Sequence, residues 1–198
     1  KENLLGPRGG GFVVAQTRLG GGRIHHAMRT SGRVQRIFDM MCERAISRTT
    51  QGELLSKKQM VQEMIADSWI EMEMFRLLVL RTAWRIDRYN DYKFVRKDIS
   101  AVKAAMPGVY RNIASRALQI HGSLGASWEM PFGKEVIESF HMGLADGPTE
   151  VHKVQVARRV LDSYVPCDDL FPTGHLPKRR AAAEAKYADV LERHLQTH

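Results

Sequence analysis

Residues 22–49, GRIHHAMRTSGRVQRIFDMMCERAISRT, decide the fold of this chain. Apolar side chains recur there at intervals of three or four residues, the spacing of one helix face; they are Ile24, Ala27, Met28, Val34, Ile37, Met41, Ala45 and Ile46. Such a stripe indicates a helix that buries one side against other helices. We therefore predict a helix from Gly22 to Thr49, ended by the turn Gln51-Gly52.

The same periodicity continues to about residue 164. It predicts further helices at residues 56–89, 98–120, 132–141 and 148–164. Ser56 and Gln59 have the spacing of a capping box at the start of the second helix. Because only short turns separate these helices, neighbours should run antiparallel. The predicted fold class is all-α, an antiparallel four-helix bundle.

The two ends of the chain have a different composition. In residues 1–21, glycine and proline surround one short apolar run, Phe12–Ala15, which suggests the last strand of a preceding strand-rich domain. Pro166–Pro177 has the composition of a linker, and Lys178–Leu195 that of an exposed terminal helix. We divide the chain at residues 1–21, 22–165 and 166–198, and expect it to be a fragment or a split subunit.

Composition excludes several classes of protein. The 198 residues contain two cysteines, Cys42 and Cys167, too few for a disulfide framework or a four-cysteine zinc site. No apolar run reaches the roughly 18 residues that span a bilayer. The net charge of +8 suggests an anionic partner. Since no zinc-finger or RNP pattern is present, nucleic acid is not the expected partner.

Three short motifs permit more than one interpretation. Asp146-Gly147-Pro148-Thr149-Glu150 is a turn into a helix, in which Asp146 is a cap or, alternatively, a catalytic carboxylate. Gln119–Gly125 is typical of a glycine-capped helix end, or of backbone close to a phosphate. His25 and His26 are adjacent and point about 100° apart on a helix, so they cannot bind one metal together. They are interpreted as surface histidines, and no metal site is expected.

The order of four motifs resembles the C-terminal part of the acyl-CoA dehydrogenases. The motifs are LGGGRIHHAMRTSG (19–32), RTTQG (48–52) followed by Gln59, QIHGSLG (119–125) and ADGPTEVHKVQVAR (145–158), and the resemblance covers residues 1–164. It implies a strand-rich middle domain that leads into a C-terminal helical bundle. It also implies FAD held between the subunits of a homotetramer or dimer of dimers, an acyl-CoA substrate, and an electron-transfer protein as acceptor.

The resemblance assigns one group of residues to FAD. The arginine of 48–52 corresponds to one that reaches the FAD of a neighbouring subunit, and the turn at 119–123 to one that lies along the diphosphate. Ser123 replaces the second glycine of that turn, and Gln51 an aromatic side chain near the cofactor. The residues assigned to FAD are Arg48, Thr50, Gln59, Gln119, Gly122, Ser123, Pro148 and Glu150.

A second group is assigned to the substrate and the reaction. Arg23, Gly147 and Arg158 correspond to positions at the acyl-CoA substrate. Asp146 falls where many members carry the catalytic glutamate, which takes the α-proton while a hydride passes from the β-carbon to FAD. The resemblance therefore implies α,β-dehydrogenation of an acyl-CoA thioester.

Aspartate is one methylene shorter than glutamate, a loss of reach of about 1.5 Å. Three alternatives follow: Asp146 acts as base on a bulky, branched or hydroxylated acyl chain, another group such as Glu150 is the base, or catalysis is lost. We favour the first, because the Asp-Gly-Pro-Thr-Glu form resembles a branch that handles long or 4-hydroxylated acyl groups. The last corresponds to a non-catalytic helical subunit that completes another chain's flavin site or mediates assembly. The expected compartment is the cytoplasm of a bacterium, or the mitochondrion or peroxisome of a eukaryote.

Overall fold

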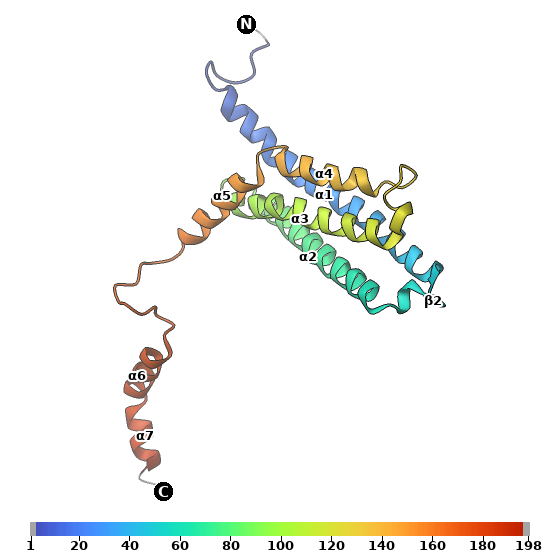
Figure 1. The fold of residues 1–198 in the computed structure, drawn as a ribbon. Helices are drawn as coiled ribbons and strands as arrows, with labels where there is room; N and C mark the ends of the chain where they lie inside the picture. The colour runs from blue at the N-terminus through green and yellow to red at the C-terminus, as the bar shows by residue number, and fades with distance from the viewer. Residues whose placement is uncertain (1–2, 196–198) are drawn as a thin grey trace. The chain divides into compact units, whose positions relative to one another are not determined.

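Four long helices lie side by side in a computed structural model that describes residues 3–195 (Figure 1). They are α1 (Gly11–Ser47), α2 (Gln59–Tyr89), α3 (Arg96–His121) and α4 (Phe132–Leu144). α3 packs against α1, α2 and α4, so it is the central helix of the bundle. The prediction of an all-α, antiparallel four-helix bundle is confirmed.

The core contains the apolar stripes expected from the sequence. Val34, Ile37 and Met41 of α1 are buried, and they share one cluster with residues of α2 and α3. The other fully or nearly fully buried members include Met72, Phe75, Val79, Val102, Met106, Tyr110 and Ile113. Burial of one face of each helix supplies the main stabilisation of such a bundle.

The strand expected at Phe12–Ala15 is wrong. These residues belong to α1, which begins at Gly11, eleven residues before the predicted start. The glycines that argued against a helix are needed for packing: a Cβ at Gly20 would lie 3.1 Å from the Tyr92 ring, and Gly22 faces Asp146. Close contact across the bundle therefore overrides the low helix propensity of glycine. The assignment of residues 1–21 to a preceding domain stays a prediction.

A small hairpin connects α1 to α2. β1 (Thr49–Thr50) pairs antiparallel with β2 (Glu53–Leu54), and the turn residues Gln51 and Gly52 both have positive φ, 52° and 83°. Positive φ at both central positions is the type I′ turn that suits a two-residue hairpin. The capping box predicted for α2 is wrong, because Ser56 lies in the 3-10 turn η1 (Leu55–Lys57) and α2 begins at Gln59 with no side-chain cap.

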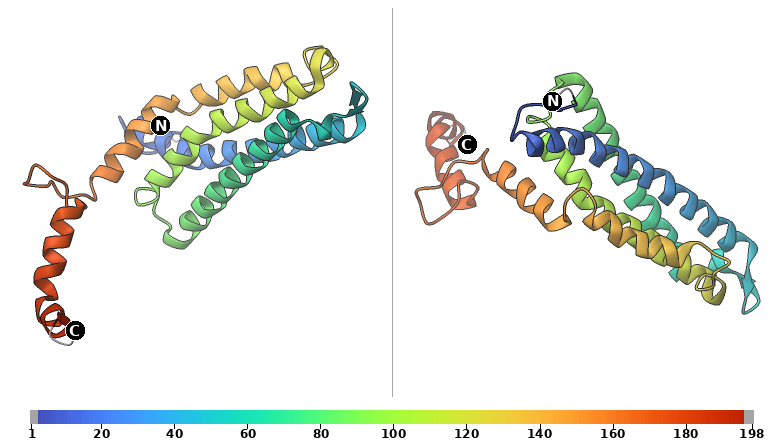
Figure 2. Two further views of the ribbon diagram at one scale, coloured as in Figure 1. Left: turned by 60° about the horizontal axis from the view of Figure 1, so that its bottom comes forward. Right: turned by 90° about the horizontal axis from the view of Figure 1, so that it is seen from above.

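The ends of the helices gather at two ends of the bundle. The hairpin and the connection from α3 to α4, which contains the 3-10 turn η2 (Gly122–Leu124), lie at the same end (Figure 2). The N-terminal part of α1 and the turn from α4 to α5 (Thr149–Leu161) lie toward the other end. Any site at one end is therefore separate from any site at the other.

The described residues form two compact units, one up to Val160 and one from Leu161 onward. The second unit contains α6 (Leu176–Lys186) and α7 (Ala188–Leu195), which Tyr187 interrupts, where the sequence predicted one terminal helix. Within residues 3–195, no helix is long and apolar enough to cross a membrane.

Candidate active site

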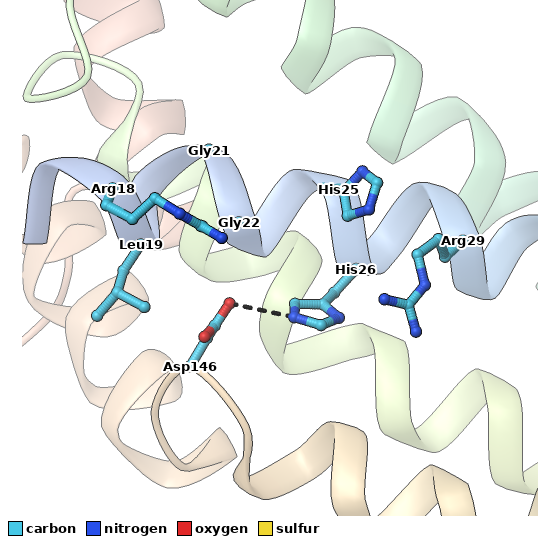
Figure 3. Close-up of a pocket in the computed structure, with 8 residues that line it drawn as sticks. All are labelled: Arg18, Leu19, Gly21, Gly22, His25, His26, Arg29 and Asp146. Atoms are coloured by element: carbon cyan, nitrogen blue, oxygen red, sulfur yellow. Dashed lines mark ion pairs between the residues drawn. The ribbon is translucent and has the colours of Figure 1, made fainter. Parts of the chain in front are cut away.

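Asp146 lies on a tight turn between α4 and α5. Its φ is 57° and that of Gly147 is 106°, so two successive residues have left-handed backbone. Aspartate enters this region more readily than most side chains, because its short polar group bonds locally. Non-glycine residues in this region concentrate at functional sites. The turn directs the Asp146 side chain toward α1 (Figure 3).

Two donors from different helices hold the backbone carbonyl of Asp146. Arg23 on α1 donates from Nε at 3.0 Å, and Nε2 of His152 on α5 lies 3.3 Å from the same oxygen. A carbonyl oxygen has two lone pairs and can accept both bonds. The position of Asp146 is thus fixed from α1 and α5 together.

His152 is connected to a buried polar chain. Its Nδ1 lies 3.3 Å from Ser100 Oγ, which in turn lies 2.7 Å from Gln155 Oε1. Burial lowers the pKa of His152 below its ordinary value of 6.5, the Asp146 carbonyl opposes this, and the cations Arg23 and Lys103 lower it further. Because a carbonyl oxygen only accepts, Nε2 carries the hydrogen of the bond to Asp146.

Lys103 secures the end of α4 immediately before the turn. Its side chain is 1% exposed, and Nζ donates to the carbonyl of Met142 at 2.5 Å. A cation at a helix C-terminus satisfies a carbonyl that has no helical partner. Burial lowers the pKa of Lys103, and the nearby carboxylates Asp146 and Glu150 raise it.

The Asp146 carboxylate faces an open cavity. Its Oδ2 lies 3.4 Å from Nε2 of His26, at ion-pair distance but without hydrogen-bond geometry, and the side chain is 17% exposed. The cavity has a volume of about 830 Å³ and lies along one side of α1 (Figure 3). Its lining residues are Arg18, Leu19, Gly21, Gly22, His25, His26, Arg29 and Asp146.

The residues predicted to contact FAD at 48–59 lie at the opposite end of the bundle. Thr50 and Gln59 line a second cavity of about 650 Å³, together with Lys57 and Lys58. Arg48 is the C-terminal cap of α1 and is exposed. Gln119 lies in the last turn of α3, and Gly122 and Ser123 follow it in η2, at the same end of the bundle as the hairpin (Figure 2).

The structure therefore divides the predicted residues into two groups. Arg23, Asp146 and Gly147 come together, with Pro148 and Glu150 beside them at the start of α5. Arg48 is 25 positions after Arg23 on the same helix, which is about 38 Å at 1.5 Å per residue. Arg158 lies in the last turn of α5 and is exposed, away from the Asp146 turn.

Comparison with known proteins identifies the family of this chain. The family model described as "Acyl-CoA dehydrogenase, C-terminal domain" matches residues 9–161. The chain belongs to this family. Acyl-CoA dehydrogenase family member 11 of Rattus norvegicus is 41% identical over 160 residues, which are 81% of this chain and 20% of that protein. (R)-benzylsuccinyl-CoA dehydrogenase of Thauera aromatica is 36% identical over 162 residues, 81% of this chain and 39% of that protein.

A solved acyl-CoA dehydrogenase has the same fold. The butyryl-CoA dehydrogenase of Megasphaera elsdenii superimposes with a TM-score of 0.75 at 27% identity, over 81% of this chain and 41% of that one. The chain thus spans less than half the length of each of these relatives. It corresponds to the C-terminal helical domain of an acyl-CoA dehydrogenase, as the sequence predicted.

Sequence reasoning missed several residues that lie around Asp146. His26 was interpreted as a surface histidine, yet it lies against the Asp146 carboxylate. His152, Lys103 and Gly22 had no assigned role, and all three are buried around the turn. His152 follows Asp146 by only six residues, which could have indicated that the two lie close together. The helix pattern alone is equally consistent with a histidine that packs in the core.

Proposed function

We propose that this chain is the catalytic C-terminal part of an FAD-dependent acyl-CoA dehydrogenase, with Asp146 as the base. The observation that supports this most directly is the Asp146 carboxylate, fixed through its backbone and directed into an open cavity. A base must lie within reach of the α-proton and be partly removed from water. Asp146 meets the second condition, since its side chain is mostly buried.

The reaction needs a base and a hydride acceptor. The carboxylate takes the proton from the α-carbon, the β-hydrogen leaves with its electron pair, and the bond between the two carbons becomes double. When bound, FAD supplies the acceptor for that hydride. Arg23, Gly147 and Arg158 are proposed to contact the acyl-CoA.

The residues at the hairpin end fit a group with phosphates. Gly122 has φ 64° and ψ −139°, a conformation that glycine adopts without strain and that leaves its backbone uncovered by a side chain. The neighbouring cavity carries the cation Lys57, while Lys58 in the same cavity is paired with Glu53 at 2.6 Å. Arg48, Thr50, Gln59, Gln119 and Ser123 would hold FAD there. We propose Pro148 and Glu150 as contacts to a second FAD, on the Asp146 side of the same chain.

The separation of the two groups supports a shared cofactor. Arg48 and Asp146 belong to opposite ends of one bundle, so one chain cannot place both against the same flavin. A homotetramer or dimer of dimers with FAD between subunits would bring Asp146 of one chain to Arg48 of another. An electron-transfer protein is the proposed acceptor of the flavin's electrons.

We further propose that the acyl chain is long, bulky or 4-hydroxylated. A shorter base leaves more room beside the α-carbon, and Gly21 contributes no side chain to the cavity wall. The Thauera relative, whose name specifies (R)-benzylsuccinyl-CoA, supports a substituted acyl group. We infer on this basis that the chain belongs to the branch with the Asp-Gly-Pro-Thr-Glu turn.

The test uses the full-length enzyme with Asp146→Asn. Asparagine keeps the size of the side chain and cannot accept the proton, so anaerobic addition of a long or 4-hydroxylated acyl-CoA should no longer bleach the flavin absorbance. FAD should stay bound. The matched control is Asp87→Asn, an exposed change on α2 that should bleach at the wild-type rate. Bleaching by Asp146→Asn at an undiminished rate would remove Asp146 from the role of base and favour a non-catalytic chain.

A further inference from the structure

Gly22 forms an opening in α1 for the Asp146 carboxylate. The residue is buried, and a Cβ built on it would lie 3.0 Å from Asp146 Oδ2 and 2.9 Å from Arg18 Nη1. A contact under about 3.4 Å forces one of the two groups to move. Glycine at position 22 therefore lets the carboxylate approach the helix backbone more closely than any other residue would.

His26 follows Gly22 by four residues and so lies on the same face of α1, one turn further on. Its Nε2 is 3.4 Å from Asp146 Oδ2, and its side chain is 24% exposed. Figure 3 shows the imidazole and the carboxylate directed toward each other, while His25 points away from Asp146. The carboxylate thus lies beside the opening at Gly22, with the imidazole next to it.

Two buried atoms of this pair lack hydrogen bonds. Among the described residues, neither Asp146 Oδ2 nor His26 Nδ1 has a hydrogen-bond partner. Buried polar atoms without partners are uncommon, and they concentrate where a group acts on a ligand or a proton. A small rotation would convert the 3.4 Å contact into a hydrogen bond, and apo sites often tighten in this way.

We propose that His26 is a positioning residue for Asp146, a role that rests on the proposed function of Asp146 as base. His26 donates from Nε2 to Oδ2 and holds the short carboxylate at the α1 wall of the cavity, in line with the α-carbon of the substrate. In this arrangement Nε2 carries the donated hydrogen.

The first test compares His26→Gln with His26→Leu in the full-length enzyme. Glutamine places an amide N–H near the position of Nε2, whereas leucine fills the space without a donor. His26→Leu should lower the rate of flavin reduction at saturating acyl-CoA by about 10- to 100-fold, because a displacement near 1 Å costs that much. The Kd for acyl-CoA should change by less than about 3-fold. His26→Gln should recover most of the rate. The matched control His141→Gln changes an exposed histidine of α4 that does not line the cavity, and it should leave the rate unchanged.

The second test moves the carboxylate without touching His26. Gly22→Ala adds the methyl group that meets Oδ2, so the carboxylate has to shift and the reduction rate should fall. Gly32→Ala on the same helix has open space around its added Cβ and should leave the rate unchanged.

Equal rates for His26→Leu and wild type would overturn the proposal, as would equal losses for His26→Leu and His26→Gln. Either result would leave the base role of Asp146 intact if Asp146→Asn is inactive. Bleaching by Asp146→Asn would instead contradict the proposed function itself.

Discussion

Two buried polar side chains, those of His152 and Lys103, hold the turn at Asp146. His152 is 2% exposed and Lys103 1% exposed, and each holds a backbone carbonyl at one side of the turn. Burial penalises the charged form of both, which lowers their pKa values. The pKa values of these groups therefore differ between the folded and the unfolded chain. Because of this difference, the free energy of unfolding depends on pH.

We predict a loss of stability on acidification that depends on His152. The unfolded chain protonates this histidine below about pH 6.5, while the folded chain, with its lowered pKa, stays neutral to lower pH. Between those two pKa values the unfolded state binds more protons. The free energy of unfolding therefore falls as the pH is lowered, by at most about 1.4 kcal/mol per pH unit. Urea unfolding of the chain should show a smaller fall between pH 7 and 5 for His152→Gln than for His25→Gln. Equal falls would contradict the prediction.

The sequence predicted Asp146 as a turn residue and, through the family motif, as the base. It could not predict His26, because the adjacency of two histidines says only that they cannot share a metal. The contact of His26 with Asp146 depends on how α1 packs beside the turn between α4 and α5, which is a relation between residues 120 positions apart. Such long-range relations are not contained in local periodicity.

Among the elements, α2 combines a predicted core face with an unexpected outer face. Met72, Phe75 and Val79 are buried as the periodicity required. On the opposite side a second apolar stripe is exposed; its members are Ile70, Met74, Leu77, Leu80 and Trp84, between 45% and 63% exposed. An apolar stripe of this length on an otherwise polar helix is typical of a surface that packs against another chain. α1 shows the reverse case. Local propensity predicted no helix before residue 22, yet close packing at Gly20 and Gly22 favours the helical conformation there.

We predict that Leu77→Lys in the full-length enzyme weakens its assembly. A lysine at the centre of this apolar stripe would place an unpaired charge in the interface, at a cost of several kcal/mol, so the dissociation constant of the oligomer should rise at least about 100-fold. Light scattering after size exclusion should report a smaller species. Asp87→Lys places a lysine at an exposed position outside the stripe, with a larger change in net charge, and should leave the mass unchanged. An unchanged mass for Leu77→Lys would exclude this face from the interface.

At the scale of the whole molecule, the bundle separates the two halves of the proposed site. Its length is set by α1, whose 37 residues extend about 55 Å. Helix periodicity could predict this length and the antiparallel order of the helices. It could not predict that the residues assigned to FAD lie at both ends of the bundle. The order of the motifs along the chain does not determine which helix ends lie side by side. Because Arg48 and Asp146 lie at opposite ends of the bundle, the proposed flavin site would need residues from two chains.

A shared site can be tested by complementation between two inactive full-length variants. Asp146→Asn removes the base, and Arg48→Ala removes the proposed contact to the neighbour's FAD, so each homo-oligomer should be inactive or nearly so. In a mixed oligomer, a site that takes Asp146 from the Arg48→Ala chain and Arg48 from the Asp146→Asn chain is intact. If sites form between pairs of chains, random 1:1 assembly makes half of the pairs mixed, and each has one intact site in two. Coexpression should therefore restore about one quarter of the wild-type activity per site. A site built within one chain would restore none, since every chain would still carry one of the two substitutions.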